Sequence, residues 1–109
     1  MLTNAISTEL INGLQDILAD KLLAVVLYGS VAREENTLDS DVDIAVIIQG
    51  NMNENEKDKF ISWNADLDIK HNKVFSIVDI EKELMDKWGD VVPFYKNIKT
   101  EGIVLWKAA

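Results

Sequence analysis

Two aspartates separated by one residue are the side chains in this sequence best suited to chemistry. Asp41 and Asp43 lie at the start of the apolar run 42–48 (VDIAVII), which is typical of a buried strand. Side chains two apart on a strand point to the same face, so the two carboxylates should lie side by side. Such oxygen ligands suit Mg²⁺, which is commonly held by one or two carboxylates and substrate phosphates. An Asp-x-Asp pair is common, so a metal site depends on what else lies beside it.

Gly29 and Ser30 provide the second half of a site. They follow the apolar run 22–28 (LLAVVLY), which predicts a strand buried on both faces. Glycine lets the backbone approach a ligand closely, and a short helix beginning at Ser30 would point free N–H groups at an anion. If the two strands are neighbours, this phosphate cradle and the carboxylates meet at one edge of the sheet. Such a site suits in-line attack on a phosphorus atom.

Helices are predicted around these two strands. Residues 3–20 form an amphipathic pattern in which Leu10, Leu14, Ile17 and Leu18 recur at helical spacing, with Thr3 or Asn4 as the cap. Residues 54–70 predict a second long helix, and its core-side candidates are Phe60, Trp63, Leu67 and Ile61. Shorter helices are expected over 81–88, ended by Gly89, and over 93–101, between Pro93 and Gly102.

The remaining segments complete the expected fold. Residues 73–80 (KVFSIVDI) predict a third strand and residues 103–106 (IVLW) a short last strand, whereas residues 34–40 are polar and indicate a loop. Strands alternating with helices predict an α/β or α+β domain with a small mixed β-sheet flanked by helices. A chain of 109 residues suffices for one such domain.

Composition excludes several classes of function. The chain has no cysteine, so disulfides and thiolate chemistry are absent and a zinc site would lack its usual ligands. Its formal net charge is −8, which argues against binding a nucleic-acid backbone. That charge does not argue against a single nucleotide, because a divalent metal can neutralise the triphosphate. A basic protein partner also fits.

The sequence carries no sign of a membrane or export signal. No apolar stretch reaches the roughly twenty residues that a membrane-spanning helix needs. The N-terminal residues have neither a basic region nor an apolar run of the secretory type. A cytoplasmic location is therefore expected.

The spacing of these residues resembles a known signature. Gly29-Ser30, ten intervening residues and Asp41-x-Asp43 are similar to the motif of the DNA polymerase β-like nucleotidyltransferases. The fuller string GSVAREENTLDSDVDIAV and the segment PFYKNIKTEG resemble the single-domain branch called minimal nucleotidyltransferases (MNT). The resemblance implies a polymerase β-like fold in which residues 1–109 form one MNT domain.

The resemblance also implies an activity. Family members use two Mg²⁺ ions and transfer a nucleoside monophosphate, here AMP from ATP, to a hydroxyl. By position, Asp41 and Asp43 would be the catalytic metal ligands, and the nucleotide would be held by Gly29, Ser30, Arg33 and Ser40. Many MNT proteins are antitoxins that adenylylate a tyrosine of a HEPN-domain ribonuclease toxin, so such a toxin is the partner that the resemblance implies.

The sequence departs from the family pattern at two positions. Glu34 stands where a glycine often follows the arginine, a change expected to alter only the loop. The family's third carboxylate usually lies on the next strand, where the best alignment places Ser76. Asp79 is the nearest carboxylate, but a residue three positions further along falls on the opposite strand face. A non-catalytic antitoxin that neutralises its partner by contact is therefore the alternative.

Other candidates have simpler interpretations. A small-molecule acceptor, as in antibiotic-modifying relatives, would need an extra helical domain for which this chain has no room. His71 is the only histidine, and a lone histidine is a poor metal site. Tyr28 and Tyr95 are most simply packing residues.

Overall fold

The computed structural model describes residues 2–32 and 41–109. Its elements follow in the order α1 (Asn4–Leu18), a 3-10 turn η1 (Ala19–Lys21), β1 (Leu22–Tyr28), α2 (Gly29–Ala32), β2 (Val42–Ile48), α3 (Glu54–His71), β3 (Phe75–Glu81), α4 (Lys82–Trp88), α5 (Pro93–Glu101) and β4 (Ile103–Lys107). The helices and strands predicted from the sequence are confirmed. The predicted loop over residues 34–40 lies outside the described residues.

The four strands form one mixed sheet in the order β3-β2-β1-β4. β1 is antiparallel to both β2 and β4, whereas β2 and β3 are parallel. A parallel pair needs a long crossover connection, and α3 provides it. The predicted α+β fold with a small mixed sheet is therefore confirmed, and the two strands that carry the candidate site are direct neighbours.

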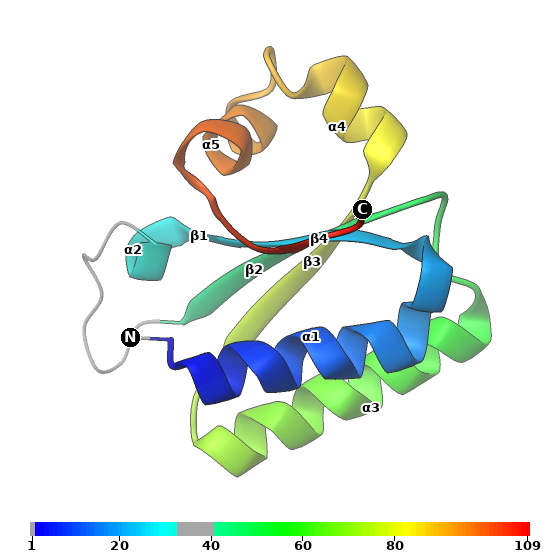
Figure 1. Cartoon of the computed structure of the whole chain (residues 1–109), viewed down its shortest axis with the longest axis vertical. Coiled ribbons are helices and arrows are strands. Elements are labelled where there is room, and N and C mark those ends of the chain that lie inside the picture. Colours follow the sequence, from blue (N-terminus) through cyan, green and yellow to red (C-terminus); the bar gives the residue numbers. More distant parts are fainter. Residues whose placement is uncertain (1, 33–40) are drawn as a thin grey trace.

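Helices cover both faces of the sheet (Figure 1). α1 and α3 lie side by side on one face, and α4 and α5 lie over the other. On β2, the residues Val42, Ile44, Val46 and Ile48 join the core beneath α1 and α3. Ala45 and Ile47 join the second core beneath α4 and α5. Because side chains alternate along a strand, Asp43 belongs to the α4/α5 face.

The larger core lies between the sheet and the helices α1 and α3. The Thr3 hydroxyl caps α1 by accepting from the Ile6 backbone N–H at 3.2 Å, and Leu10, Leu14 and Leu18 are buried at helical spacing. Among the expected core residues of α3, Leu67 is buried, and Phe60 and Trp63 pack against the same core. The expectation for Ile61 is wrong: its side chain is 66% exposed. One residue advances a helix by about 100°, which turns Ile61 away from the stripe that Phe60 begins.

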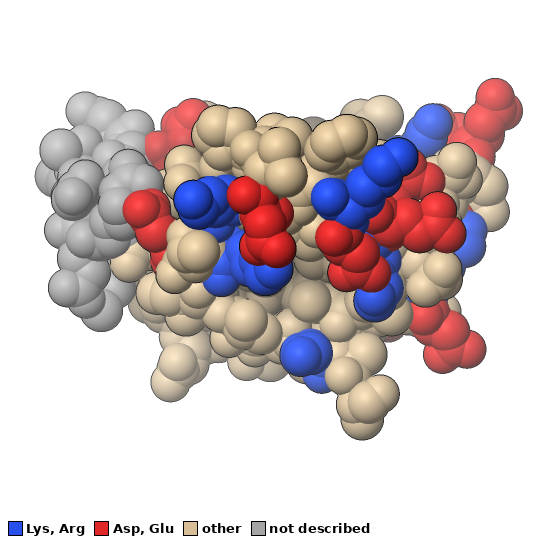
Figure 2. All heavy atoms as spheres, turned by 90° about the horizontal axis from the view of Figure 1, so that it is seen from above, with Lys and Arg blue, Asp and Glu red and all other residues tan. Residues whose placement is uncertain are grey.

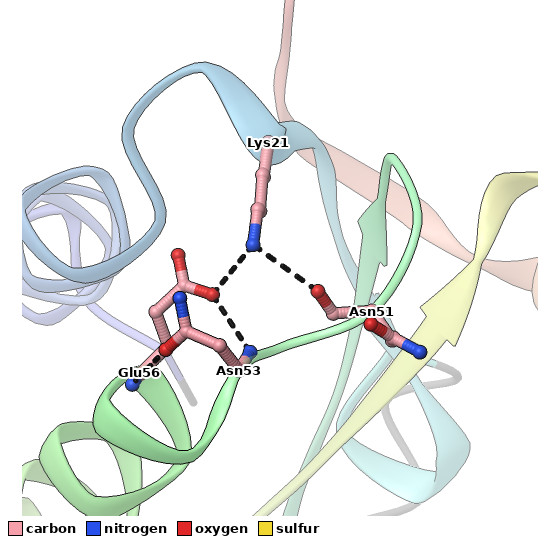
Figure 3. Close-up of polar contacts among 4 residues, drawn as sticks. All are labelled: Lys21, Asn51, Asn53 and Glu56. Atoms are coloured by element: carbon pink, nitrogen blue, oxygen red, sulfur yellow. Dashed lines mark hydrogen bonds and ion pairs between the residues drawn. The ribbon is translucent and has the colours of Figure 1, made fainter.

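A network of polar contacts sets the start of α3 (Figure 3). The Asn53 side-chain oxygen accepts from the Glu56 backbone N–H at 2.8 Å, while Glu56 Oε1 accepts from the Asn53 backbone N–H at 2.9 Å. This capping box satisfies two N–H groups that the helix leaves unbonded. Lys21 Nζ donates to Glu56 Oε1 at 2.7 Å and to the Asn51 carbonyl at 3.2 Å. The end of η1 is thereby tied to the start of α3.

β3 begins two residues later than the apolar pattern suggests. Val74 is exposed, and the strand runs from Phe75 to Glu81. α3 ends at His71, and the next residue, Asn72, has a φ of 50°, the left-handed conformation that often terminates helices. No helix within residues 2–32 and 41–109 is both long enough and apolar enough to cross a membrane.

Candidate functional site

The turn after β1 forms one side of the candidate site. β1 ends at Tyr28, and the chain enters α2 at Gly29 with a φ of +76°. That conformation is readily adopted only by glycine. Ser30 lies in α2, as the sequence predicted.

Asp43 lies against this turn from the neighbouring strand. Tyr28 and Asp43 are paired residues in the antiparallel β1/β2 register. A Cβ atom added to Gly29 would overlap Asp43 Oδ2 and would lie 3.1 Å from Asp43 Cγ. The prediction that the glycine turn and the carboxylate pair meet at one edge of the sheet is confirmed for Gly29 and Asp43.

Asp41 and Asp43 differ in their exposure. Asp43 is the second residue of β2 and is half-buried, whereas Asp41 precedes the strand and is exposed. Within the described residues, no group of three Asp, Glu, His or Cys side chains could hold a metal ion. The Asp43 carboxylate against the glycine turn, with Asp41 two residues before it, still matches the donor set of Mg²⁺, which commonly combines one or two carboxylates with phosphates and water. Because residue 29 has no side chain, the Asp43 carboxylate lies directly against the backbone of this turn.

The parallel strand β3 presents a hydroxyl beside Asp43. Ser76 is paired with Asp43, and Asp79 is paired with Val46. Val78 and Ile80, on the same side of β3 as Ser76, pack in the α4/α5 core. Ser76 therefore shares the face of Asp43, and Asp79 lies in the alternate set, as the sequence predicted. Asp79 is exposed and does not bring a third carboxylate to the pair.

Two aromatic residues border the site, and sequence reasoning treated one of them only as a packing residue. Tyr28 is half-buried and contacts Phe94 edge-on, with ring centroids 5.7 Å apart. Burial raises the pKa of the Tyr28 hydroxyl above 10.0, and the negative charge of Asp43 raises it further. Phe94 in turn packs on Tyr95 and is 42% exposed. The signal for Tyr28 was its place at the end of β1; nothing local marked Phe94.

Two predicted nucleotide-binding residues, Arg33 and Ser40, lie outside the described residues. The structure therefore brings together Gly29, Asp43 and Ser76, with the exposed Asp41 immediately before the strand that carries Asp43.

Comparison with known proteins agrees with this geometry. Residues 12–108 match the family described as "Polymerase beta, Nucleotidyltransferase". Two proteins of Methanocaldococcus jannaschii, each named "Putative protein adenylyltransferase", are similar to the chain. One is 32% identical over 72% of this chain and 80% of its own length. The other is 29% identical over 90% of this chain and 92% of its own length.

Solved structures share the fold. A toxin–antitoxin crystal structure with AMP-PNP has a TM-score of 0.65 at 20% identity, covering 94% of this chain and 73% of the other. A complex of a tri-AMPylated Shewanella oneidensis HEPN toxin with an MNT antitoxin has a TM-score of 0.58 at 19% identity. The match covers 94% of this chain and 70% of the other. At these identities the likeness shows the polymerase β-like fold.

Proposed function

Because the chain belongs to the polymerase β nucleotidyltransferase family, we propose that it transfers AMP from ATP to a tyrosine hydroxyl of a HEPN-type toxin and so acts as an antitoxin. The observation that carries this proposal is the contact between the Gly29 turn and the Asp43 carboxylate across two neighbouring strands. The names of the archaeal relatives support protein adenylylation. The described complex of a tri-AMPylated HEPN toxin with an MNT antitoxin supports the choice of partner.

Each residue of the candidate site has a role in this proposal. Asp41 and Asp43 would hold Mg²⁺, which when bound would stabilise the attacking and leaving oxygens. The backbone at Gly29 and Ser30, with Arg33 and Ser40, holds the triphosphate. The acceptor oxygen bonds to the α-phosphorus while the bond from that phosphorus to the oxygen bridging to the β-phosphate breaks. Pyrophosphate leaves, and the hydroxyl proton passes to a base of the partner protein, because Ser76 stands at the β3 position paired with Asp43.

The acceptor comes from the partner protein in this proposal. The chain has a net charge of −8, which favours a partner with a basic surface. The exposed carboxylate of Asp41 lies at the same end of the sheet as the half-buried Asp43. Metal binding there would reduce the local negative charge and admit the triphosphate.

The test is the mass of the partner after co-expression. The wild-type chain is expected to yield a HEPN partner that is heavier by one or more AMP units. The double variant Asp41→Asn/Asp43→Asn should yield an unmodified partner while keeping the fold, as checked by circular dichroism. Asp16→Asn/Asp20→Asn removes the same charge from exposed positions of α1 and η1 and should leave modification unchanged. Wild-type modification by the Asp41/Asp43 variant would refute the assigned site.

A second function is favoured by one observation. Ser76, not a carboxylate, is the β3 residue paired with Asp43, so a group that deprotonates the acceptor is missing from that position. The chain could then neutralise its partner by contact alone. A partner that co-purifies inactive but without added AMP would support this binding function and contradict the enzymatic one.

A further inference from the structure

A groove separate from the candidate site opens on the α4/α5 side of the sheet. Its volume is about 330 Å³. It is lined by residues 23–26 of β1, the end of β2, the helices α4 and α5, and β4. Its lining residues include Val26, Ile47, Met85, Ile98 and Val104. Asp43 lies at the opposite end of β2 from Ile47. The groove is therefore at the other end of this face from the glycine turn and the carboxylates.

The floor of the groove is apolar. Val26, Ile47 and Ile98 belong to the smaller core and are buried, so they form a fixed base. At the margin, Val104 of the edge strand β4 is 57% exposed. An apolar hollow bordered by an exposed valine gains free energy when an apolar group displaces water from it.

The rim of the groove carries positive charge in a chain that is acidic as a whole. Lys82, Lys99, Lys107 and Asp86 are the charged residues that line it. With Asp90, which pairs with Lys99, three lysines and two aspartates give the rim a formal charge of +1. The whole chain has a net charge of −8. Figure 2 shows the molecule from the α4/α5 side, where basic and acidic side chains lie next to one another.

The rim lysines are available to a ligand. Lys82 pairs with Asp86 at 2.6 Å and Lys99 pairs with Asp90 at 2.8 Å, and all four side chains are at least half exposed. Such exposed ion pairs contribute little stability, so exchanging them for a ligand anion costs little. No ion pair of Lys107 is found within the described part of the chain.

We propose that this groove binds a small amphipathic anion, with an apolar body on the floor and a carboxylate between the rim lysines. The volume is at the lower end of the range of small-molecule sites, about 300–1,000 Å³. It is too small for the apolar face of a whole helix. Three lysines are too few for a nucleic-acid backbone. The site does not depend on the proposed adenylylation, since it shares no residue with the glycine turn or the carboxylate pair.

The experiment is an NMR titration of the ¹⁵N-labelled full chain with octanoate. Saturable shifts are expected at amides around the groove, such as those of Val104 and Lys107. Octylamine has the same tail and the opposite charge. Its affinity should be lower than that of octanoate by about tenfold or more, because the rim lysines repel it. A saturable site elsewhere, or equal affinity for both probes, would overturn the proposal.

Variants separate the rim from general charge effects. Lys99→Gln/Lys107→Gln should weaken octanoate binding about tenfold, whereas Lys57→Gln/Lys59→Gln, which removes the same charge from exposed positions of α3, should not. Val104→Glu places an anion at the exposed margin and should also weaken binding. Unchanged affinity in the rim double variant would contradict the proposal. So would groove binding of an acidic amphipathic peptide when octanoate does not bind.

Discussion

Gly29 and the carboxylate of Asp43 occupy adjoining space across β1 and β2, so closely that a single methyl group on Gly29 would overlap Asp43 Oδ2. Gly29 also has a φ of +76°. Glycine is therefore required at this position for two reasons: the backbone has a positive φ, and the Asp43 carboxylate occupies the space that a side chain would need. This relationship connects the two halves of the motif physically, because any side chain at residue 29 must move the carboxylate.

The first prediction concerns Gly29→Ala. Displacement of Asp43 should lower AMP transfer about a hundredfold, since misplacement of a reacting group by about 1 Å costs that much. Backbone strain should also lower the free energy of unfolding by about 1–3 kcal/mol. The transfer rate can be measured by partner mass, and the stability by urea denaturation.

Gly50→Ala is the matched control for this substitution. Gly50 has a φ of +71°, but no atom lies within 4 Å of a Cβ added there. Gly50→Ala should therefore lower the free energy of unfolding through backbone strain but leave the rate of AMP transfer unchanged. If both variants lose activity equally, the contact between Gly29 and Asp43 has no catalytic importance.

The second prediction tests the hydroxyl beside Asp43. Ser76→Asp puts a third carboxylate at the β3 position paired with Asp43. With Mg²⁺ present, we expect AMP transfer to rise about tenfold or more, because a positioned general base typically contributes 10²–10⁴-fold. Single-turnover transfer to the partner is the measurement.

Asp79 supplies the control for that prediction. Its exposed side chain lies on the alternate set of β3 residues, so Asp79→Asn should leave the transfer rate unchanged. Loss of activity in Asp79→Asn would mean that Asp79, and not residue 76, provides the third carboxylate. A Ser76→Asp variant no faster than the wild type would show that proton removal does not limit the reaction.

The third prediction concerns the titration of Tyr28. Burial is the larger cause of its raised pKa and the charge of Asp43 the smaller one. Asp43→Asn should therefore lower the Tyr28 pKa but leave it above 10.0. Because the folded pKa is raised, its contribution to stability is complete below pH 10 and is lost as the pH rises through the folded value. Tyrosine ¹³C NMR gives the pKa, with Tyr28→Phe identifying the signal. An unchanged pKa in Asp43→Asn would contradict the pairing of the two side chains.

The sequence allowed much of the fold to be predicted, because the relevant signals are local. The apolar run of β2 is bounded by polar residues and was predicted to the residue. Asn53 and Glu56 mark the start of α3 by a capping pattern that needs only four positions. The polar Asp43 inside an apolar strand marked the candidate site for the same reason.

What could not be predicted depends on contacts between distant segments. The pairing of Ser76 with Asp43 is set by how α3 returns the chain to the sheet. No local pattern encodes it, and only the family resemblance placed Ser76 at that position. The position of Phe94 against Tyr28 depends on the packing of α5 over β1. Ile61 was misassigned because its apolar character alone suggested burial, whereas the helix turns it to solvent.

The last prediction concerns acid stability at the two ends of the α1/α3 layer. Glu56 accepts from Lys21 at one end, and Glu9 contacts Lys70 and His71 at the other. Hydrogen bonds from the lysines are the largest cause that lowers the pKa of each glutamate below 4.5.

The sign of the pH effect follows from these depressed pKa values. Each pair stabilises the fold above pH 4.5, and its contribution is lost as the pH falls through the folded pKa. Glu9→Gln/Glu56→Gln should therefore be less stable than the wild type at pH 7 but lose less stability on acidification. Asp58→Asn/Asp66→Asn removes two exposed charges from α3 and should retain the wild-type loss below pH 4.5. Urea denaturation between pH 7 and pH 3 gives the free energy of unfolding of the wild type and of both double variants as a function of pH. If this free energy falls equally with pH in all three proteins, neither glutamate pair contributes to acid sensitivity.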